Sequence, residues 1–187
     1  MRPKRPMAFA LLLLFCFMVF LATGDIAFAS KKFPAEIPRP FVLEEFVANW
    51  ELEGSIWILI DKPSFSLTQY RGTQKISSYP VALGKNPENK QRAGDMRTPE
   101  GVFKVKSIHD SKHWVHDFGD GKGPIPGAYG PWFIRLETGW KGIGIHGTHD
   151  PASIGTLATE GCIRMKNEDL LRIVDETPVG TVVVITP

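Results

Sequence analysis

The sequence predicts a mainly β protein with short helices, built around one domain. Three observations support this fold class. From Ser55 onward, apolar residues form short runs or alternate with polar residues, as they do in strands. Only two stretches place apolar residues at helical spacing. The composition, 43% hydrophobic and 22% charged over 187 residues, is that of an ordinary globular protein.

This composition excludes a disordered chain, a coiled coil, a collagen-like repeat and a multi-pass membrane protein. The formal net charge is +2, and three basic residues and one acidic residue fall within residues 1–29. The remainder therefore holds 19 basic and 19 acidic residues. A balanced charge gives no electrostatic reason to expect a nucleic-acid partner.

Residues 1–29 are predicted to be a cleaved signal peptide. A basic start precedes an apolar run from Met7 to Ala22, and Ala27-Phe28-Ala29 supplies the small residues of a cleavage site. The alternative is an uncleaved anchor, but this run is shorter than the roughly 20 residues of a membrane span. We therefore expect cleavage after Ala29, export to the periplasm or cell-wall space, and no stable membrane anchor.

Cleavage would leave one cysteine in the mature chain. Cys16 lies in the apolar run and would be removed, so Cys162 would remain alone. An exported protein with one cysteine cannot form an internal disulfide bond. Cys162 is then expected to be buried, paired with another chain or used in chemistry.

Residues 30–53 are expected to form an extended lead-in followed by a short helix. Three prolines between residues 30 and 40 favour an extended chain. The helix should end near Gly54 and is predicted from apolar residues at helical spacing, Leu43, Phe46, Val47 and Trp50. Residues 54–187 are expected to form the main domain.

Strands are predicted along most of that domain. Residues 56–60 are continuously apolar, which suits a strand covered on both faces, and residues 65–70 and 73–79 flank a turn at Arg71-Gly72 and predict a hairpin. Residues 102–107 alternate, which predicts one buried face and one wetter face that includes Val102. Further strands are expected at residues 132–136, 141–146 and 181–185.

Two stretches interrupt this pattern. Residues 84–99 are polar and end in a turn, and residues 119–130 contain five glycines, which predicts irregular structure. Because long ordered loops are often functional, residues 109–131 are expected to form either a lid over a site or a surface excursion whose aromatic residues pack down. Trp114 and Tyr129 are the candidate substrate contacts in this loop.

A second helix is predicted from residue 167. Asn167 has the side chain of a helix cap, Glu168 and Asp169 place acid in the first turn, and Pro178 should end the helix.

The strand that contains His146 is the first candidate site element. Side chains alternate along a strand, so Gly142, Gly144 and His146 are expected to share one face. Two glycines beside a histidine would leave a groove for an extended peptide, although glycines in strands also mark bulges without a ligand.

Cys162 and His146 together suggest nucleophilic catalysis. Cysteine reacts as its thiolate, and a histidine that accepts the thiol proton would stabilise that thiolate and lower the pKa of the thiol. The N–H groups of Gly161 and Cys162 can then point at an oxyanion. A metal site is the alternative, with His146, His149 and Cys162 as ligands and His116 as an outside fourth.

The motifs resemble a known family. His146-Gly147-Thr148, residues 151–155, Gly161-Cys162-Ile163-Arg164-Met165 and residues 178–183 are similar to the catalytic domain of L,D-transpeptidases, the YkuD-like enzymes of bacterial cell walls. Residues 98–103 resemble this family too, and the resemblance covers about residues 54–186. It implies one β-sandwich or barrel-like catalytic domain over residues 54–187, a peptidoglycan stem-peptide substrate, and no metal or organic cofactor.

The resemblance also implies a role for each matching residue. Cys162 would be the nucleophile and His146 the general base, and the Gly147 carbonyl would orient the imidazole. Arg164 would hold a substrate carboxylate, or else form a structural salt bridge. Carbapenem-type inhibitors are expected to acylate Cys162.

Glu160 departs from the family pattern. Many members carry histidine directly before the Gly-Cys pair, and an acidic side chain pointing at the thiolate would disfavour its ionisation. Glu160 is therefore expected to face solvent or the substrate rim.

The expected reaction is acyl transfer through a Cys162 thioester, which releases a terminal D-alanine and crosslinks the third residues of two stems. With water as acceptor, the chain would instead be an L,D-carboxypeptidase. A non-catalytic peptidoglycan-binding module is the third interpretation, and it predicts wall retention that does not depend on Cys162.

Overall fold

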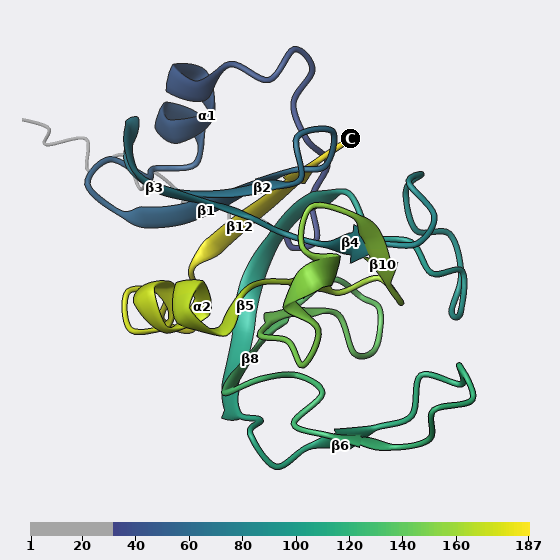
Figure 1. Cartoon of the computed structure of the whole chain (residues 1–187). Coiled ribbons are helices and arrows are strands. Elements are labelled where there is room, and N and C mark those ends of the chain that lie inside the picture. Colours follow the sequence, from purple (N-terminus) through teal and green to yellow (C-terminus); the bar gives the residue numbers. More distant parts are fainter. Residues whose placement is uncertain (1–31) are drawn as a thin grey trace, which may run out of the picture. The chain divides into compact units, whose positions relative to one another are not determined.

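A mixed sheet of eight strands is the centre of the computed structural model, which describes residues 32–187 (Figure 1). The predicted signal peptide lies outside the described residues. The strand order is β11-β9-β8-β5-β12-β1-β2-β3. The strands of this sheet are β1 (Ile56–Asp61), β2 (Ser66–Arg71), β3 (Gln74–Pro80), β5 (Gly101–Asp110), β8 (Trp132–Leu136), β9 (Gly144–His146), β11 (Ile163–Arg164) and β12 (Val182–Thr186).

Strand β1 is covered on both faces, as its continuous apolar sequence predicts. Ile58 and Ile60 belong to the hydrophobic cluster that includes residues of α2 (Asn167–Val174). Trp57 belongs to a second cluster with residues of α1 (Leu43–Asn49). The two helices therefore lie on opposite faces of the sheet at β1 and β12 (Figure 1).

The long strand β5 joins the two halves of the curled sheet. Its first residues pair with β12, and from Val105 it pairs with β8, with a register shift between Val105 and Ser107. An extra residue in one strand bends the strand and increases the local twist, which is how this sheet curls. The prediction of a mainly β, barrel-like fold with short helices is confirmed.

Burial corrects one detail of β5. Val102 is fully buried in the cluster beneath α1 rather than lying on a wet face. The alternation of residues 102–107 distinguishes the two faces of β5. Near the start of β5, however, the lead-in and α1 cover the face that was expected to be wet.

Strand β9 is shorter than predicted. Residues 141–146 were expected to be extended, but Lys141 and Gly142 form a turn and the strand begins at Gly144. Gly142 has φ +77°, a backbone conformation that favours glycine and ends an extended segment.

Two short ladders lie outside the main sheet. Strand β4 (Leu83–Gly84) pairs in parallel with β10 (Leu157–Thr159). Strand β6 (Val115–His116) pairs with β7 (Ile125–Pro126). The second ladder corrects the prediction that residues 119–130 hold no regular structure. A 3₁₀ helix, η1, spans Pro151–Ser153.

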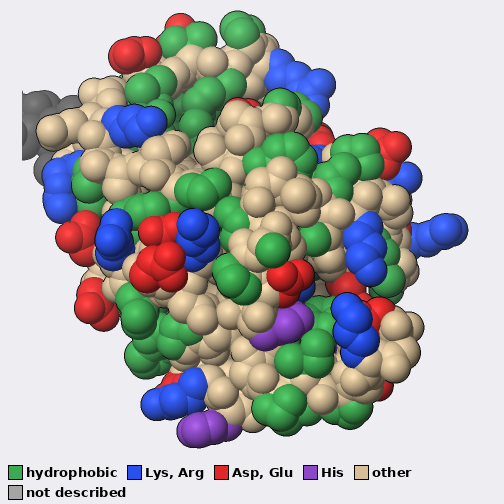
Figure 2. Space-filling view, viewed as in Figure 1, with side chains coloured by type: hydrophobic (Ala, Val, Ile, Leu, Met, Phe, Trp, Pro, Cys, Tyr) green, Lys and Arg blue, Asp and Glu red, His purple; other side chains and the backbone are tan. Residues whose placement is uncertain are grey.

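Charged side chains of both signs are interspersed over the face visible in Figure 2, in keeping with the balanced charge of the sequence. Among residues 32–187, no helix is both long and apolar enough to cross a membrane.

Candidate active site

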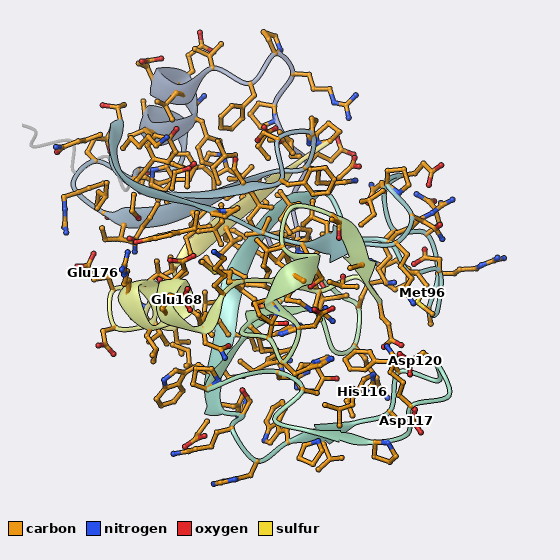
Figure 3. All side chains as sticks on the ribbon, in the orientation of Figure 1. Met96, His116, Asp117, Asp120, Glu168 and Glu176 are labelled. Carbon is orange, nitrogen blue, oxygen red and sulfur yellow. The ribbon has the colours of Figure 1, made fainter. Side chains whose placement is uncertain are left out.

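A cavity of about 480 Å³ brings together the residues that the sequence analysis singled out. The residues that line it come from β9, β11 and the loop before β11, and from residues 84–99, 109–131 and 140–143. Met96 and His116, labelled in Figure 3, are two of them. The lining residues include Lys90, Met96, His116, Phe118, Tyr129, Gly142, His146, Glu160, Cys162 and Arg164.

His146 lies at the end of β9 between two backbone ladders. It pairs with Phe133 of β8 on one side and with Arg164 of β11 on the other. Its side chain is 2% exposed. The Phe133 ring stacks on the imidazole at 5.5 Å between centroids, and the Tyr129 ring meets it edge-on at 4.9 Å. The imidazole of His146 is therefore held by packing as well as by its strand.

The ring nitrogens of His146 have separate tasks. Nδ1–H donates to the Gly147 carbonyl oxygen over 2.6 Å, as the resemblance implied for that glycine. This bond leaves Nε2 as the proton acceptor. Burial lowers the pKa of His146 to about 3, against the opposing effect of the Gly147 hydrogen bond and helped by the charge of Arg164. His146 is thus neutral at neutral pH.

The predicted groove beside Gly144 is filled. A Cβ atom on Gly144 would lie 2.3 Å from the Phe133 ring, so the missing side chain admits Phe133 rather than a peptide. Gly144 does mark a close approach, but the group that approaches is the Phe133 ring behind His146. No groove for a peptide remains there.

Cys162 follows the β10 strand and directly precedes β11, and it is partly exposed. Its thiol donates to the Gly142 carbonyl oxygen over 3.0 Å. Burial raises the pKa of the Cys162 thiol to about 11, a backbone hydrogen bond at Gly144 opposes the rise, and the charge of Glu160 adds to it.

The resting pair is therefore a neutral thiol and a neutral imidazole. The expected lowering of the Cys162 pKa by an imidazolium is corrected, because burial disfavours both charged partners.

The predicted oxyanion hole is available only in part. The Gly161 N–H donates to the Thr159 hydroxyl over 3.1 Å, so this donor is already used. The same hydroxyl donates to the Cys162 carbonyl oxygen over 2.7 Å. Among the described residues, the Cys162 N–H has no hydrogen-bond partner. The structure therefore corrects the role of Gly161 in the resting state and leaves Cys162 as the open donor.

Glycine is nevertheless required at position 161. Its φ is +125°, and a Cβ atom would lie 2.6 Å from the Arg97 carbonyl oxygen. This close approach fixes the loop that presents Cys162 against residues 84–99.

Arg164 is a buried cation that faces the cavity. It is 4% exposed, its guanidinium donates to the Ser153 hydroxyl over 2.9 Å, and its Nε has no hydrogen-bond partner. Among the described residues, no carboxylate forms a salt bridge with it. The structural salt-bridge alternative is therefore wrong, and Arg164 retains donors for an anionic ligand.

The loop of residues 109–131 covers the cavity through some of its aromatic residues. Tyr129 lines the cavity, and burial raises its pKa to about 12. Trp114 lies behind the cavity and packs on Tyr129 and Phe133 at 6.0 and 5.5 Å between centroids. Trp114 was predicted to contact substrate; the structure instead gives it a packing role behind Tyr129 and Phe133.

Glu160 lies at the rim of the cavity, as expected. It is 3.1 Å from Nε2 of His116, with the two side chains 38% and 28% exposed. This pair joins the loop of residues 109–131 to the segment that carries Cys162.

Three residues of the site carry no clear functional signal in the sequence: Phe133, Lys90 and Asn167. The pattern predicts Phe133 only as a strand residue and Lys90 only as part of the polar stretch of residues 84–99. Asn167 was predicted to cap α2, but its side chain binds Thr148 instead. The sequence signal for a role of Asn167 at the site was its position, three residues after Arg164.

The metal alternative lacks the required geometry. Among residues 32–187, no group of three or more histidine, cysteine, aspartate or glutamate side chains could hold a metal ion. His149 instead contacts the Ala128 carbonyl oxygen through Nδ1 at 3.2 Å and packs on Phe118.

Comparison with known sequences identifies relatives. A family model described as the YkuD L,D-transpeptidase catalytic domain matches residues 55–185. The chain is 32% identical over 123 residues to the L,D-transpeptidase-class protein YkuD of Bacillus licheniformis, covering 65% of this chain and 60% of that protein. It is 30% identical over 137 residues to YqjB of Bacillus subtilis, covering 72% and 73% of the two chains. The chain thus spans about 60% of the length of the first relative, which is less than two thirds.

Solved structures share the fold. L,D-transpeptidase 3 of Mycobacterium tuberculosis, in complex with a faropenem-derived adduct, is 16% identical with a TM-score of 0.55, over 71% of this chain and 60% of that one. LdtMt1 in complex with imipenem is 17% identical with a TM-score of 0.53, over 71% and 59% of the two chains. At this identity, the likeness shows the fold alone.

Proposed function

The chain belongs to the family of YkuD L,D-transpeptidase catalytic domains, and on that premise we propose that it is an exported cysteine acyltransferase acting on peptidoglycan tetrapeptide stems. The observation that carries the proposal is the joint placement of Cys162, His146 and Arg164. They lie on or beside two paired strands, line one cavity, and comprise a thiol, a neutral base and a buried cation.

The first half-reaction forms the thioester. The Cys162 thiol leaves the Gly142 carbonyl and gives its proton to Nε2 of His146 as Sγ attacks the carbonyl carbon of the third stem residue. The Cys162 N–H donates to the developing oxyanion. When the intermediate collapses, the bond to the terminal D-alanine breaks and the imidazolium protonates the departing amine. D-Alanine leaves, and the acyl group stays on sulfur.

The second half-reaction transfers the acyl group. The side-chain amine of the third residue of another stem attacks the thioester, and His146 takes a proton from that amine. The C–S bond breaks, the thiolate recovers the proton, and a crosslink between the two third residues remains. Water as the acceptor would give a shortened stem instead.

Arg164 and the loop of residues 109–131 complete the proposed site. The unpaired donors of the buried guanidinium suit a stem carboxylate, because desolvated charge-assisted hydrogen bonds are strong. Tyr129, His116 and Phe118 cover the same cavity, which supports a lid role for this loop. Export to the periplasm or cell-wall space, where such stems are found, remains a proposal that follows from residues 1–29.

β-Lactam acylation belongs to the same proposal. The solved neighbours with imipenem and a faropenem-derived adduct support the expectation that carbapenem-type compounds react with Cys162. Their acyl carbonyl would take the place of the stem carbonyl.

Purified tetrapeptide stems test the function directly. Wild type should release one D-alanine for each crosslink formed, and mass spectrometry should detect the crosslinked dimers. Cys162→Ala should yield neither product, and His146→Gln should yield very little. Release of D-alanine without dimers would establish the carboxypeptidase reaction. Product formation by Cys162→Ala would exclude the thioester mechanism.

A further inference from the structure

Asn167 begins α2, but its side chain is directed at the site rather than at its own helix. No side-chain hydrogen bond caps α2. Instead, Oδ1 of Asn167 accepts the N–H of Thr148 over 2.8 Å, and Nδ2 donates to the Thr148 carbonyl oxygen over 3.0 Å. Both ends of one amide therefore bind one residue of the loop that follows His146.

The bond to Thr148 acts on the orientation of the Gly147 carbonyl. The Thr148 N–H and the Gly147 C=O are the two ends of a single peptide unit, which is planar and resists twisting. The Gly147 C=O is the acceptor for Nδ1–H of His146, at 2.6 Å. An acceptor that fixes the N–H end therefore also fixes the carbonyl end.

Two glycines create the space for the Asn167 amide. A Cβ atom on Gly147 would lie 2.2 Å from Oδ1 of Asn167, and one on Gly130 would lie 2.3 Å from the same atom. Gly130 ends the loop that covers the cavity. The Asn167 amide is thus seated between the base loop and the covering loop, in room that only these glycines leave.

We propose that Asn167 is a positioning residue. It holds the Gly147–Thr148 peptide so that the carbonyl keeps His146 in the Nδ1–H tautomer, with Nε2 free to take the Cys162 proton. Its catalytic consequence rests on the proposed function, whereas the tautomer is a property of the free protein. Loss of this tautomer would make Nε2 a donor, and the base would then be unable to accept the thiol proton.

The variants separate positioning from simple packing. Asn167→Ala removes both bonds to Thr148, whereas Asn167→Asp keeps an acceptor for the Thr148 N–H and replaces the donor with a second oxygen that faces the Thr148 carbonyl. Glu168→Ala is the matched control, because Glu168 is exposed in the first turn of α2 and lies away from His116 and Met96 (Figure 3).

The readouts are the tautomer of His146 and its reaction with meropenem. Nitrogen NMR of the five ¹⁵N-labelled histidines, assigned with His146→Gln, should show one Nδ1–H tautomer in wild type and in Glu168→Ala. Asn167→Ala should show a mixture. The acylation rate constant should fall roughly 10- to 100-fold in Asn167→Ala, as for other small misplacements of a catalytic group, and recover most of this loss in Asn167→Asp.

A wild-type tautomer in folded Asn167→Ala would overturn the proposal. A uniform loss in both Asn167 variants, with no change in the His146 spectrum, would do the same and leave only a structural role. Failure of wild type to react with meropenem would count against the proposed function alone, because the nitrogen spectra would still decide the positioning role. Thermal melting confirms that each variant is folded.

Discussion

The candidate active-site cavity is built from two regions that are held in different ways. The frame, residues 132–136, 144–146 and 161–164, carries His146, Cys162 and Arg164. Its strands pair through their backbones, and Ile145 and Ile163 are fully buried beside His146 and Cys162. The wall comprises residues 84–99, which polar side chains hold, and residues 109–131, which are held by aromatic packing and by the His116–Glu160 pair.

Charged side chains hold part of the wall. The carboxylate of Asp95 accepts Lys90 Nζ at 2.7 Å and the N–H groups of Gln91, Arg92 and Arg97. His116 pairs with Glu160 at 3.1 Å in the other loop. The frame is held by backbone ladders and buried side chains, whereas these wall contacts are made by titratable side chains. Packing therefore holds the groups proposed to react, whereas charged contacts hold part of the loops around them.

The largest expected effect comes from breaking the contact that joins the two regions. Gly161→Ala would place a Cβ atom 2.6 Å from the Arg97 carbonyl oxygen at φ +125°. Strain and overpacking together should cost about 2–5 kcal/mol of unfolding free energy and displace Cys162. Urea unfolding and meropenem acylation measure both effects.

Gly155→Ala is the control for this substitution. Gly155 also has a positive φ, +87°, but a Cβ atom there would meet nothing within 4 Å. Gly155→Ala should show the backbone strain without the clash, and it should react with meropenem at the wild-type rate. Equal losses in the two variants would show that the Arg97 contact contributes nothing.

Acid should act on the frame through His146. Burial lowers its pKa to about 3 in the folded state, whereas the unfolded chain binds the proton below about 6.5. The unfolding free energy of wild type should therefore have its full value above pH about 6.5. It should decrease as the pH falls below that value, by on the order of a few kcal/mol. His146→Gln should lose less stability than wild type over this interval. The unfolding free energies of wild type and His146→Gln can be measured by chemical unfolding at several pH values. If the two changed in parallel with pH, His146 would not be neutral in the folded protein.

A local effect is expected in the wall. Burial raises the pKa of Asp95, but hydrogen bonds from Lys90 and the backbone N–H groups outweigh this and lower the pKa overall. The stabilisation from Asp95 is then present above the unfolded pKa of about 3.9 and is lost as the pH falls further. At neutral pH, Asp95→Asn should speed hydrogen exchange at Gln91 and Arg92 with little change in melting temperature.

Asp175→Asn provides the comparison, because Asp175 is exposed and lies outside the wall. Exchange at Gln91 and Arg92 should be unchanged in that variant. Global destabilisation by Asp95→Asn would mean that the wall is part of the core structure and would remove the distinction between the two regions.

The smallest effect is expected at the rim. The charge of Glu160 raises the pKa of Cys162, but burial is the larger cause. Because Glu160 is partly exposed and paired with His116, Glu160→Gln should raise the meropenem acylation rate constant only about twofold to threefold. An increase of a hundredfold would show that Glu160 controls the thiol.

The sequence predicted the long strands and the reacting pair for clear physical reasons. The apolar run of β1 and the hairpin of β2 and β3 carry local signals that the packed sheet preserves. The chemistry of cysteine and histidine suggests Cys162 and His146, the family resemblance implies the Gly147 carbonyl, and the structure brings the two side chains into one cavity.

The remaining features depend on partners distant in sequence. The strands of the β4–β10 and β6–β7 ladders are too short to carry a periodic pattern. Asn167 has the side chain of a helix cap, but a backbone 19 residues away competes for its amide. Likewise, the Gly161 N–H is taken by Thr159, and Trp114 is directed behind the site. Local propensity cannot distinguish such outcomes.

Intact-protein mass spectrometry after incubation with meropenem tests the central claim most directly, namely that the frame presents Cys162 as an acyl-accepting nucleophile. Wild type should gain one covalent adduct at neutral pH, and Cys162→Ala should gain none. A folded wild-type protein that forms no adduct, or an adduct that persists in Cys162→Ala, would contradict the account. The first result would favour a non-catalytic peptidoglycan-binding module.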